Sequence, residues 1–349
     1  MIEYYKLKTI ELEKELSSYK KIYLDTKYWV LFRDVALGRN KDNRLCEIFS
    51  IIQKNIDLGK IICPISYDIF IEITKQKDPN TLSKTIELID KFSQGTTLIS
   101  DPDRMEHELF MFILSQTKQE YTTNSVWTKM IHIMSPMIPE PSDLFSKEYK
   151  KEIKKLWIDD TFDKLSLAEM MKVGDITKIP HLASNLHNEL SNEKKEHYSE
   201  QDSFKEVYMS EVAGILETIK ELNNPVANVL KELYEDTTEV KLEETQDITA
   251  FNNLIYNIFD LNKMNNYLPF IDITAGIHAS VRRDKRRNYK QNDFHDFGHA
   301  RSALPYFDYF FTEHSLKNLI MQKNLNYHEK YQCQVASSYD EILEMIEIL

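Results

Sequence analysis

The sequence predicts an α/β protein, because short apolar runs alternate with amphipathic helical patterns near both ends of the chain. Alternation of this kind is typical of βαβ units, which build a parallel sheet. The middle of the chain breaks this rhythm and is rich in Lys and Glu, which predicts a mainly helical insertion. Only 7 of the 349 residues are glycine. So few glycines disfavour sandwiches with many tight turns and the glycine-rich loops that bind nucleotide phosphates.

Residues 1–100 form the first part of the predicted α/β domain, together with an N-terminal helix. Apolar residues at helical spacing predict helices over residues 3–20, 28–37, 43–58 and 80–93. Short β-prone runs predict strands over residues 21–25, 61–65 and 97–99. Ser66 is expected to cap one further helix, because a serine hydroxyl can accept a hydrogen bond from the first turn.

Residues 101–262 form the predicted helical insertion, and residues 263–349 form the second part of the α/β domain. In this second part, helices are predicted over residues 268–281, 293–304, 316–322 and 338–349. Strands are predicted over residues 307–312 and 331–335. The alternation of strands and helices therefore returns after the insertion.

Cysteine usage and hydropathy predict a cytoplasmic protein that does not enter a membrane. Cys46, Cys63 and Cys333 stand far apart and form no CxxC pair, which indicates a reducing compartment. The N-terminus has no basic segment followed by an apolar one, so it does not resemble a signal peptide. No later run approaches the roughly 18 apolar residues that are needed to span a bilayer.

The net charge of the chain is -12, which by itself opposes binding to nucleic acids. One short stretch of the chain is basic instead. Residues 282–290 (RRDKRRNYK), here called the basic segment, are typical of a phosphate-binding surface, although a merely solvated surface can look the same. The candidate nucleic-acid-binding residues are Arg282, Arg283, Arg286, Arg287 and Lys290. Tyr28, Trp29 and Tyr289 are candidates for stacking on bases, with a place in the core as the alternative.

Acidic residues stand at the ends of two predicted strands. Asp25 terminates the first strand, where it either contributes to a site or only caps the following helix. Asp308 stands at the start of the predicted strand 307–312, and Glu313 follows its end. Because sites in open α/β sheets lie at the carboxyl ends of strands, Glu313 is expected to project toward Asp25.

The densest group of polar side chains lies in the segment 292–300 (NDFHDFGHA). On a helix, Asp296 and His299 share one face, and His295 and His299 have the i,i+4 spacing that suits zinc. The pair His295-Asp296 is also similar to the doublet of HD-type phosphohydrolases. Both alternatives need further ligands, and the sequence offers only His278 upstream.

The order of these motifs resembles that of the PIN domain, a compact three-layer α/β/α nuclease fold with a central parallel sheet. Its pattern is an Asp after the first strand, an acid in the helix after the second strand and an Asp in a late helix. A final acid follows the fourth strand and often comes after Thr. The matching segments are KIYLDT (21–26), CPISYDIFIEI (63–73), NDFHDFGHA (292–300), FDYFFTEHSLKNL (307–319) and YQCQVASSYDEIL (331–343).

This resemblance implies a group of acidic catalytic residues. The implied members are Asp25, Glu72 and Asp296, with Glu313 or Asp308 as the fourth acid. Carboxylate oxygens are the ligands that Mg²⁺ and Mn²⁺ prefer. The implied metal ligands are Asp25, Asp296, Glu313 and Glu72, and His299 and Asn292 are candidates for supporting them.

The function implied by the resemblance is that of a Mg²⁺- or Mn²⁺-dependent endonuclease that hydrolyses phosphodiester bonds. RNA is favoured over DNA as the substrate, and a toxin or defence effector is the expected setting. A homodimer and a regulatory protein partner are further expectations. The alternatives are a PIN-like binding or scaffold module without activity, and an HD-type phosphohydrolase.

Overall fold

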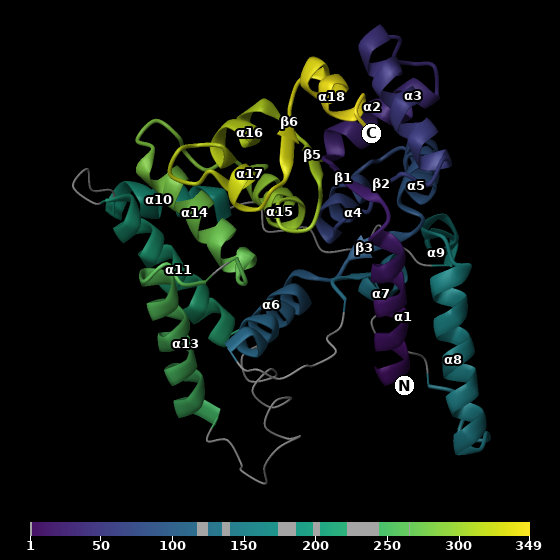
Figure 1. Cartoon of the computed structure of the whole chain (residues 1–349), viewed down its shortest axis with the longest axis horizontal. Coiled ribbons are helices and arrows are strands. Elements are labelled where there is room, and N and C mark those ends of the chain that lie inside the picture. Colours follow the sequence, from purple (N-terminus) through teal and green to yellow (C-terminus); the bar gives the residue numbers. More distant parts are fainter. Residues whose placement is uncertain are drawn as a thin grey trace.

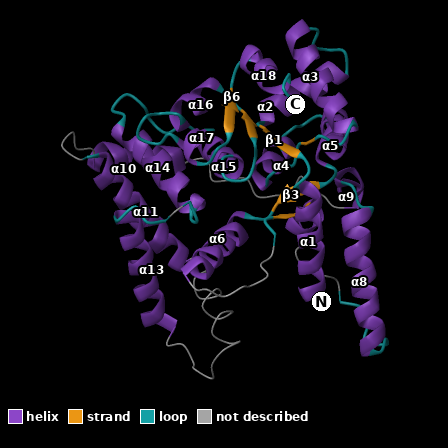
Figure 2. Ribbon diagram, viewed as in Figure 1, coloured by secondary structure: helices purple, strands orange, loops and turns teal. Residues whose placement is uncertain are grey.

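The computed structural model describes residues 2–116, 125–134, 140–173, 186–197, 203–221, 244–264 and 266–349. Within these residues, parallel strands form a central four-stranded sheet (Figure 2), so the predicted α/β class is confirmed. The strands are β1 (Lys20–Leu24), β2 (Ile61–Ile62), β5 (Tyr309–Phe311) and β6 (Gln334–Ala336). Their order across the sheet is β2-β1-β5-β6, which places the two ends of the chain in one sheet.

β1 lies in the interior of the sheet, between β2 and β5, and its last three side chains are apolar or aromatic on both faces. Its residues Ile22, Tyr23 and Leu24 are almost completely buried. They pair in parallel with Tyr309, Phe310 and Phe311 of β5. A strand that is buried on both faces is typical of a parallel sheet covered by helices.

A short antiparallel pair continues the strand region beyond β2. It consists of β3 (Thr96–Leu98) and β4 (Trp127–Lys129), and Ile65 forms an isolated parallel bridge with Thr97. β4 lies within residues 101–262, for which the sequence pattern predicted mainly helices. No strand was predicted there, because β4 forms by pairing with β3, and local periodicity does not show such a distant partner.

The helices of the first part begin close to their predicted positions. They are α1 (Ile2–Leu16), α2 (Thr26–Ala36), α3 (Asn43–Asp57), α4 (Tyr67–Thr74) and α5 (Pro79–Ser93). α2 to α5 each begin at a side chain that accepts a backbone hydrogen bond from the first turn; these caps are Asp25, Asp42, Ser66 and Asp78. Local capping therefore fixes these helix starts, as expected for Ser66.

Helices cover both faces of the sheet. On one face, Phe311 of β5 contacts Tyr28 of α2, and α2 continues through Phe32 into a group of rings that includes Phe49 of α3 and Phe92 of α5. On the other face, Tyr23 of β1 contacts His299, Phe307 and Phe310. Successive residues of a strand point to opposite faces, so the side chain of Tyr23 points away from the face to which its neighbours Ile22 and Leu24 point.

The described residues of the insertion do not form one unit. Their helices are α6 (Asp101–Gln116), α7 (Met130–Met134), α8 (Lys147–Asp163), α9 (Leu167–Val173), α10 (Leu186–His197), α11 (Phe204–Glu221) and α13 (Glu244–Asp260). Apolar residues of α8 and α9 join the core of the sheet, whereas those of α6, α11 and α13 form a second core with α14. Figure 1 shows α11 and α13 on the side of the molecule opposite α1 and α8.

The second part of the domain contains α14 (Pro269–Arg283), α15 (Asp293–Ala303), α16 (His314–Ile320), α17 (Tyr327–Lys330) and α18 (Tyr339–Ile346). The last strand, predicted over 331–335, is displaced to Gln334–Ala336. The reason is that residues 327–330 form a helical turn and Gln332 adopts a positive φ of 58° before the strand begins. In the described parts of the chain, no helix is long and apolar enough to cross a membrane.

Candidate active site

Asp25 lies at the carboxyl end of β1 and is 5% exposed. One carboxylate oxygen accepts a hydrogen bond from the backbone N–H of Lys27 at 3.2 Å, which caps α2. The other accepts a hydrogen bond from the Thr312 hydroxyl at 2.9 Å. Asp25 is therefore a helix cap. Its second hydrogen bond, from Thr312 after the neighbouring strand β5, is not needed for capping.

The position of Asp25 coincides with a reversal in strand order. From β1 the chain forms β2 on one side, and much later it forms β5 on the other side. In open α/β sheets, ligands bind outside the carboxyl ends of the strands at such a reversal. Thr312 and Glu313 follow the carboxyl end of β5, so they share this edge of the sheet with Asp25.

Glu72 on α4 forms the centre of a chain of polar contacts. Its Oε2 lies 2.8 Å from Nε2 of His299 and also accepts a hydrogen bond from the Thr26 hydroxyl. The second ring nitrogen of His299, Nδ1, lies 2.8 Å from the Tyr23 hydroxyl, which lies 2.7 Å from the Ser66 hydroxyl. α2, α4, α15 and β1 are thereby connected through polar groups that are mostly buried.

The contact between Glu72 and His299 is an ion pair. Burial alone would raise the pKa of Glu72, but the hydrogen bond and the charge of His299 outweigh it and lower that pKa to about 2. Burial would likewise lower the pKa of His299, yet Glu72, together with the charges of Asp25 and Asp68, raises it to about 9. At neutral pH the imidazolium and the carboxylate are therefore both charged.

Asp296, one turn into α15, has the opposite character. Burial and the negative charge of Asp25, reinforced by Glu313, raise the pKa of Asp296 to about 7, although His299 opposes the shift. Glu313 is exposed and stands at the start of α16. The negative charges of Asp25 and Glu313 therefore both act on Asp296.

Asp308 is not part of this group, because it lies at the opposite edge of the sheet. It precedes β5, and its carboxylate binds the ammonium group of Lys20 at 2.9 Å and the backbone N–H of Lys21 at 2.9 Å. Lys20 and Lys21 begin β1. Because the two strands are parallel, the ends that carry these residues lie together and away from Asp25.

Two of the five candidate basic residues of the basic segment are paired with acids. Arg282 binds Glu211 of α11, and Arg287 lies 3.4 Å from Asp293 at the start of α15. Arg283, Arg286 and Lys290 are exposed. The basic segment connects α14 to α15 and ends shortly before the helix that carries Asp296.

The aromatic candidates for base stacking belong to the core. Tyr28 and Trp29 have no exposed surface, and Tyr289 is 5% exposed. The ring of Tyr289 stacks on Phe294, with an angle of 5° between the planes. None of the three is accessible to a base in this structure.

The histidines of α15 do not act together. Nε2 of His295 lies 2.7 Å from the ammonium group of Lys75, which follows α4, whereas both ring nitrogens of His299 contact Glu72 and Tyr23. This arrangement supports neither a zinc pair nor an HD-type site. Among the residues that the structure describes, no three His, Cys, Asp or Glu side chains are gathered into a group that could hold a metal ion.

Sequence reasoning missed Asp68, one turn before Glu72 on α4, and Lys75, which directly follows α4. Their spacing from Glu72 is the signal that could have identified them. Asp68 faces Gly298 of α15. Burial and the charge of Asp101 raise the pKa of Asp68 to about 6, although Arg301 opposes the shift.

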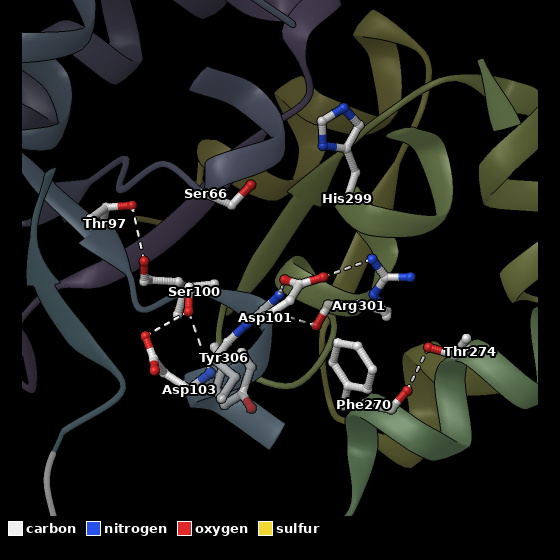
Figure 3. A network of polar contacts seen from close by, with 12 residues as sticks. Ser66, Thr97, Ser100, Asp101, Asp103, Phe270, Thr274, His299, Arg301 and Tyr306 are labelled. Carbon is white, nitrogen blue, oxygen red and sulfur yellow. Dashed lines mark hydrogen bonds and ion pairs between the residues drawn. The ribbon is translucent and has the colours of Figure 1, made fainter. Parts of the chain in front are cut away.

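Asp101 connects α6 to α15. Its carboxylate binds Arg104 of α6 and Arg301 of α15, the latter at 2.8 Å (Figure 3). Arg104 also donates a hydrogen bond to the carbonyl oxygen of Arg301. The helix that carries Asp296 and His299 is therefore attached to the first helix of the insertion by charges that are at least partly buried.

Replacement of Gly298 by Ala is expected to destabilise the protein by about 1–3 kcal/mol. A Cβ at this position would lie 2.5 Å from Cγ of Asp68, so α4 and α15 would have to separate or Asp68 would have to turn away. Urea unfolding measures this change in the free energy of unfolding. Gly214→Ala on α11 is the matched control, because its Cβ meets no atom within 4 Å. Equal stability of the two variants would contradict the expectation.

The comparisons with known proteins give no relative from which a role could be transferred to these residues. No protein-family model, curated protein or solved structure matches this chain.

Proposed function

We propose that this protein is a divalent-cation-dependent endonuclease and that RNA is its substrate. The observation that supports the proposal is that Asp25 and Glu313 follow the carboxyl ends of β1 and β5 at the reversal in strand order, and that burial together with their charges raises the pKa of Asp296. Carboxylates that repel one another in this way are stabilised by a cation between them. The preference for RNA follows from the resemblance to PIN domains.

The side chains fit Mg²⁺ or Mn²⁺ in kind, because all three offer the hard oxygen ligands that these ions prefer. Because these side chains are not gathered into a metal-binding group among the described residues, Asp25, Asp296 and Glu313 would have to draw together to hold the ion. Glu72 lies beside Asp25 through its contact with Thr26. A bound ion of this type lowers the pKa of an attacking water and neutralises charge that develops on the phosphodiester.

The other residues of the site keep these carboxylates in position. Thr312 and the backbone of Lys27 bind the two oxygens of Asp25, so its carboxylate is fixed and stays close to the end of β5. His299 keeps Glu72 ionised and orients it toward Thr26. The exposed basic residues of the basic segment would bind the phosphates of the substrate, which an acidic site alone would repel.

Incubation of the protein with labelled RNA and DNA tests this proposal, with Mg²⁺, Mn²⁺ or EDTA in parallel reactions. Cleavage of RNA that requires the metal ion supports it. Absence of cleavage with either ion would leave a binding module without activity as the better explanation.

The two candidates for the fourth acid provide a matched pair of variants. Glu313→Gln is expected to lower the cleavage rate by about 10–100-fold, because it removes a charge from the acidic group. Asp308→Asn is expected to leave the rate within about twofold, because its carboxylate binds Lys20 at the other edge of the sheet. Initial cleavage rates at saturating metal ion measure both effects. Loss of cleavage in Asp308→Asn but not in Glu313→Gln would instead place the reaction at the end of the sheet that carries Lys20, and it would contradict the proposed site.

A further inference from the structure

The basic segment is held from outside by helix α10 of the insertion. Lys194 of α10 is 5% exposed, and its ammonium group donates hydrogen bonds to three backbone carbonyl oxygens. These are the carbonyls of Val281, at 2.7 Å, and of Asp284 and Arg287. One lysine therefore binds the end of α14 and two points of the basic segment.

Two more side chains of the insertion bind the same segment. The hydroxyl of Ser191, one turn before Lys194 on α10, accepts a hydrogen bond from the backbone N–H of Tyr289 at 3.2 Å and donates its own proton to the carbonyl of His187 at 2.7 Å. Glu211 of α11 binds Arg282. The backbone of the segment is thereby fixed near its start, at its middle and near its end.

A buried lysine that binds backbone carbonyls contributes no charge to the surface. Removing an ammonium group from water is costly unless its donors are satisfied, and here three carbonyls satisfy them. Burial accordingly lowers the pKa of Lys194. A lysine in this environment stabilises one conformation of the polypeptide around it, so its effect falls on the shape of the basic segment.

The charges of the segment are divided by these contacts. Arg282 and Arg287 are neutralised by Glu211 and Asp293. Arg283, Arg286 and Lys290 remain exposed on a backbone that α10 and α11 hold in place. Asp293 also accepts a hydrogen bond from the backbone N–H of Lys290, which ties the end of the segment to the first turn of α15.

We propose that α10 and α11 of the insertion hold the basic segment as a preformed binding surface for the phosphates of RNA, directly before the helix that carries Asp296; this rests on the proposed function. Arg283, Arg286 and Lys290 are the residues that contact phosphate. Arg282, Arg287 and Lys194 are positioning residues. A surface that is already ordered binds more tightly, because less conformational entropy is lost on binding.

The first test measures binding alone. The fluorescence anisotropy of a labelled single-stranded RNA is followed in EDTA, so that cleavage does not contribute. Lys194→Met is expected to weaken binding about tenfold. Lys195→Met is the matched control, because it removes the same charge from an exposed neighbouring position on α10, and it is expected to change affinity less than twofold.

The second test separates phosphate contact from positioning. Loss of two phosphate contacts in the double variant Arg283→Gln, Arg286→Gln is expected to reduce the slope of log affinity against log salt concentration by about 1.4. Lys194→Met lowers the affinity through disorder of the segment, so trypsin should cleave after Arg283, Arg286 or Lys290 faster in this variant than in Lys195→Met. Ser191→Ala provides a milder disruption of the same contacts, in case Lys194→Met does not fold.

Equal RNA affinity of Lys194→Met, Ser191→Ala and the wild type would overturn the proposal, as would an unchanged salt dependence of the double arginine variant. Failure of the wild type to bind RNA would also overturn it. These results are distinct from failure of the proposed function. If the protein binds RNA through this surface but does not cleave it, the proposed function fails and the role proposed for the insertion stands. If the protein cleaves RNA but these variants do not affect it, the proposed function stands and the role proposed for the insertion fails.

Discussion

Asp296→Asn is expected to reduce RNA cleavage by at least about 100-fold and, at the same time, to stabilise the metal-free protein. The loss of activity follows because Asn supplies no negative charge to bind a cation. The gain in stability follows because burial and the charges of Asp25 and Glu313 disfavour the ionised Asp296. Removal of that charge is expected to raise the free energy of unfolding by about 1–2 kcal/mol at pH 8.

The pH dependence of the free energy of unfolding tests whether the charge of Asp296 is the cause of this gain in stability. In the folded protein its pKa is raised to about 7 from an ordinary value of 3.8, so between these pH values the folded state binds more protons than the unfolded state. Its contribution to stability is therefore complete below pH 3.8 and is lost as the pH rises through about 7. The free energy of unfolding, measured with urea in EDTA, should fall less steeply over this range in Asp296→Asn than in the wild type.

Asp293→Asn is the matched control, since it makes the same chemical change one turn earlier on α15. Asp293 accepts hydrogen bonds from the backbone of Lys290 and from Arg287, so its charge is compensated and its replacement should destabilise the protein. Opposite signs for the two variants are the expected result. If Asp296→Asn lowered the stability as Asp293→Asn does, the acidic group would not be under mutual repulsion.

Local features of the sequence predicted the elements that carry the site. Ser66 caps α4 and Asp25 caps α2, and both effects depend on a few neighbouring residues in the chain. The place of Asp25 at the carboxyl end of a strand also follows from the alternation of strands and helices, whereas the strand order itself does not. The choice between Glu313 and Asp308 was open in the sequence, although strand direction already separates them, because one precedes β5 and the other follows it.

Partners that come from distant parts of the chain could not be predicted in this way. The i,i+4 spacing of His295 and His299 indicated a shared ligand, whereas His299 contacts Glu72 and Tyr23 from other elements. The charge of the basic segment was evident, but its pairing with Glu211 depends on how α11 packs against α14. β4 likewise forms only because β3 lies beside it. Each of these outcomes depends on tertiary packing, which overrides local preference.

His299→Gln is expected to cause the largest loss of stability among these variants, on the order of 3–5 kcal/mol at pH 7. Gln can still donate a hydrogen bond, but it carries no charge, so the partly buried carboxylate of Glu72 loses the cation that keeps its pKa near 2. Cleavage should decrease as well, because Glu72 is then no longer fixed beside Thr26 and Asp25.

The pH range of the effect separates His299 from Asp296, because the contribution of Asp296 is lost at lower pH. The folded-state pKa of His299 is raised to about 9 from 6.5, so its contribution to stability is complete below pH 6.5 and is lost as the pH rises through about 9. The lowered pKa of Glu72 gives a contribution that is present above pH 4.5 and is lost only as the pH falls toward about 2. The pair therefore stabilises the protein most between pH 4.5 and 6.5.

Urea unfolding at pH 6 and at pH 9.5 measures this dependence. The wild type should lose stability between the two pH values, and His299→Gln should lose much less. His314→Gln, at an exposed position on α16, is expected to stay within about 0.5 kcal/mol of the wild type. A double-mutant cycle with Glu72→Gln then isolates the interaction between the two side chains. Additive effects of Glu72→Gln and His299→Gln would show that the two residues stabilise the fold independently, and in that case His299 could not be the group that keeps Glu72 ionised beside the acidic site.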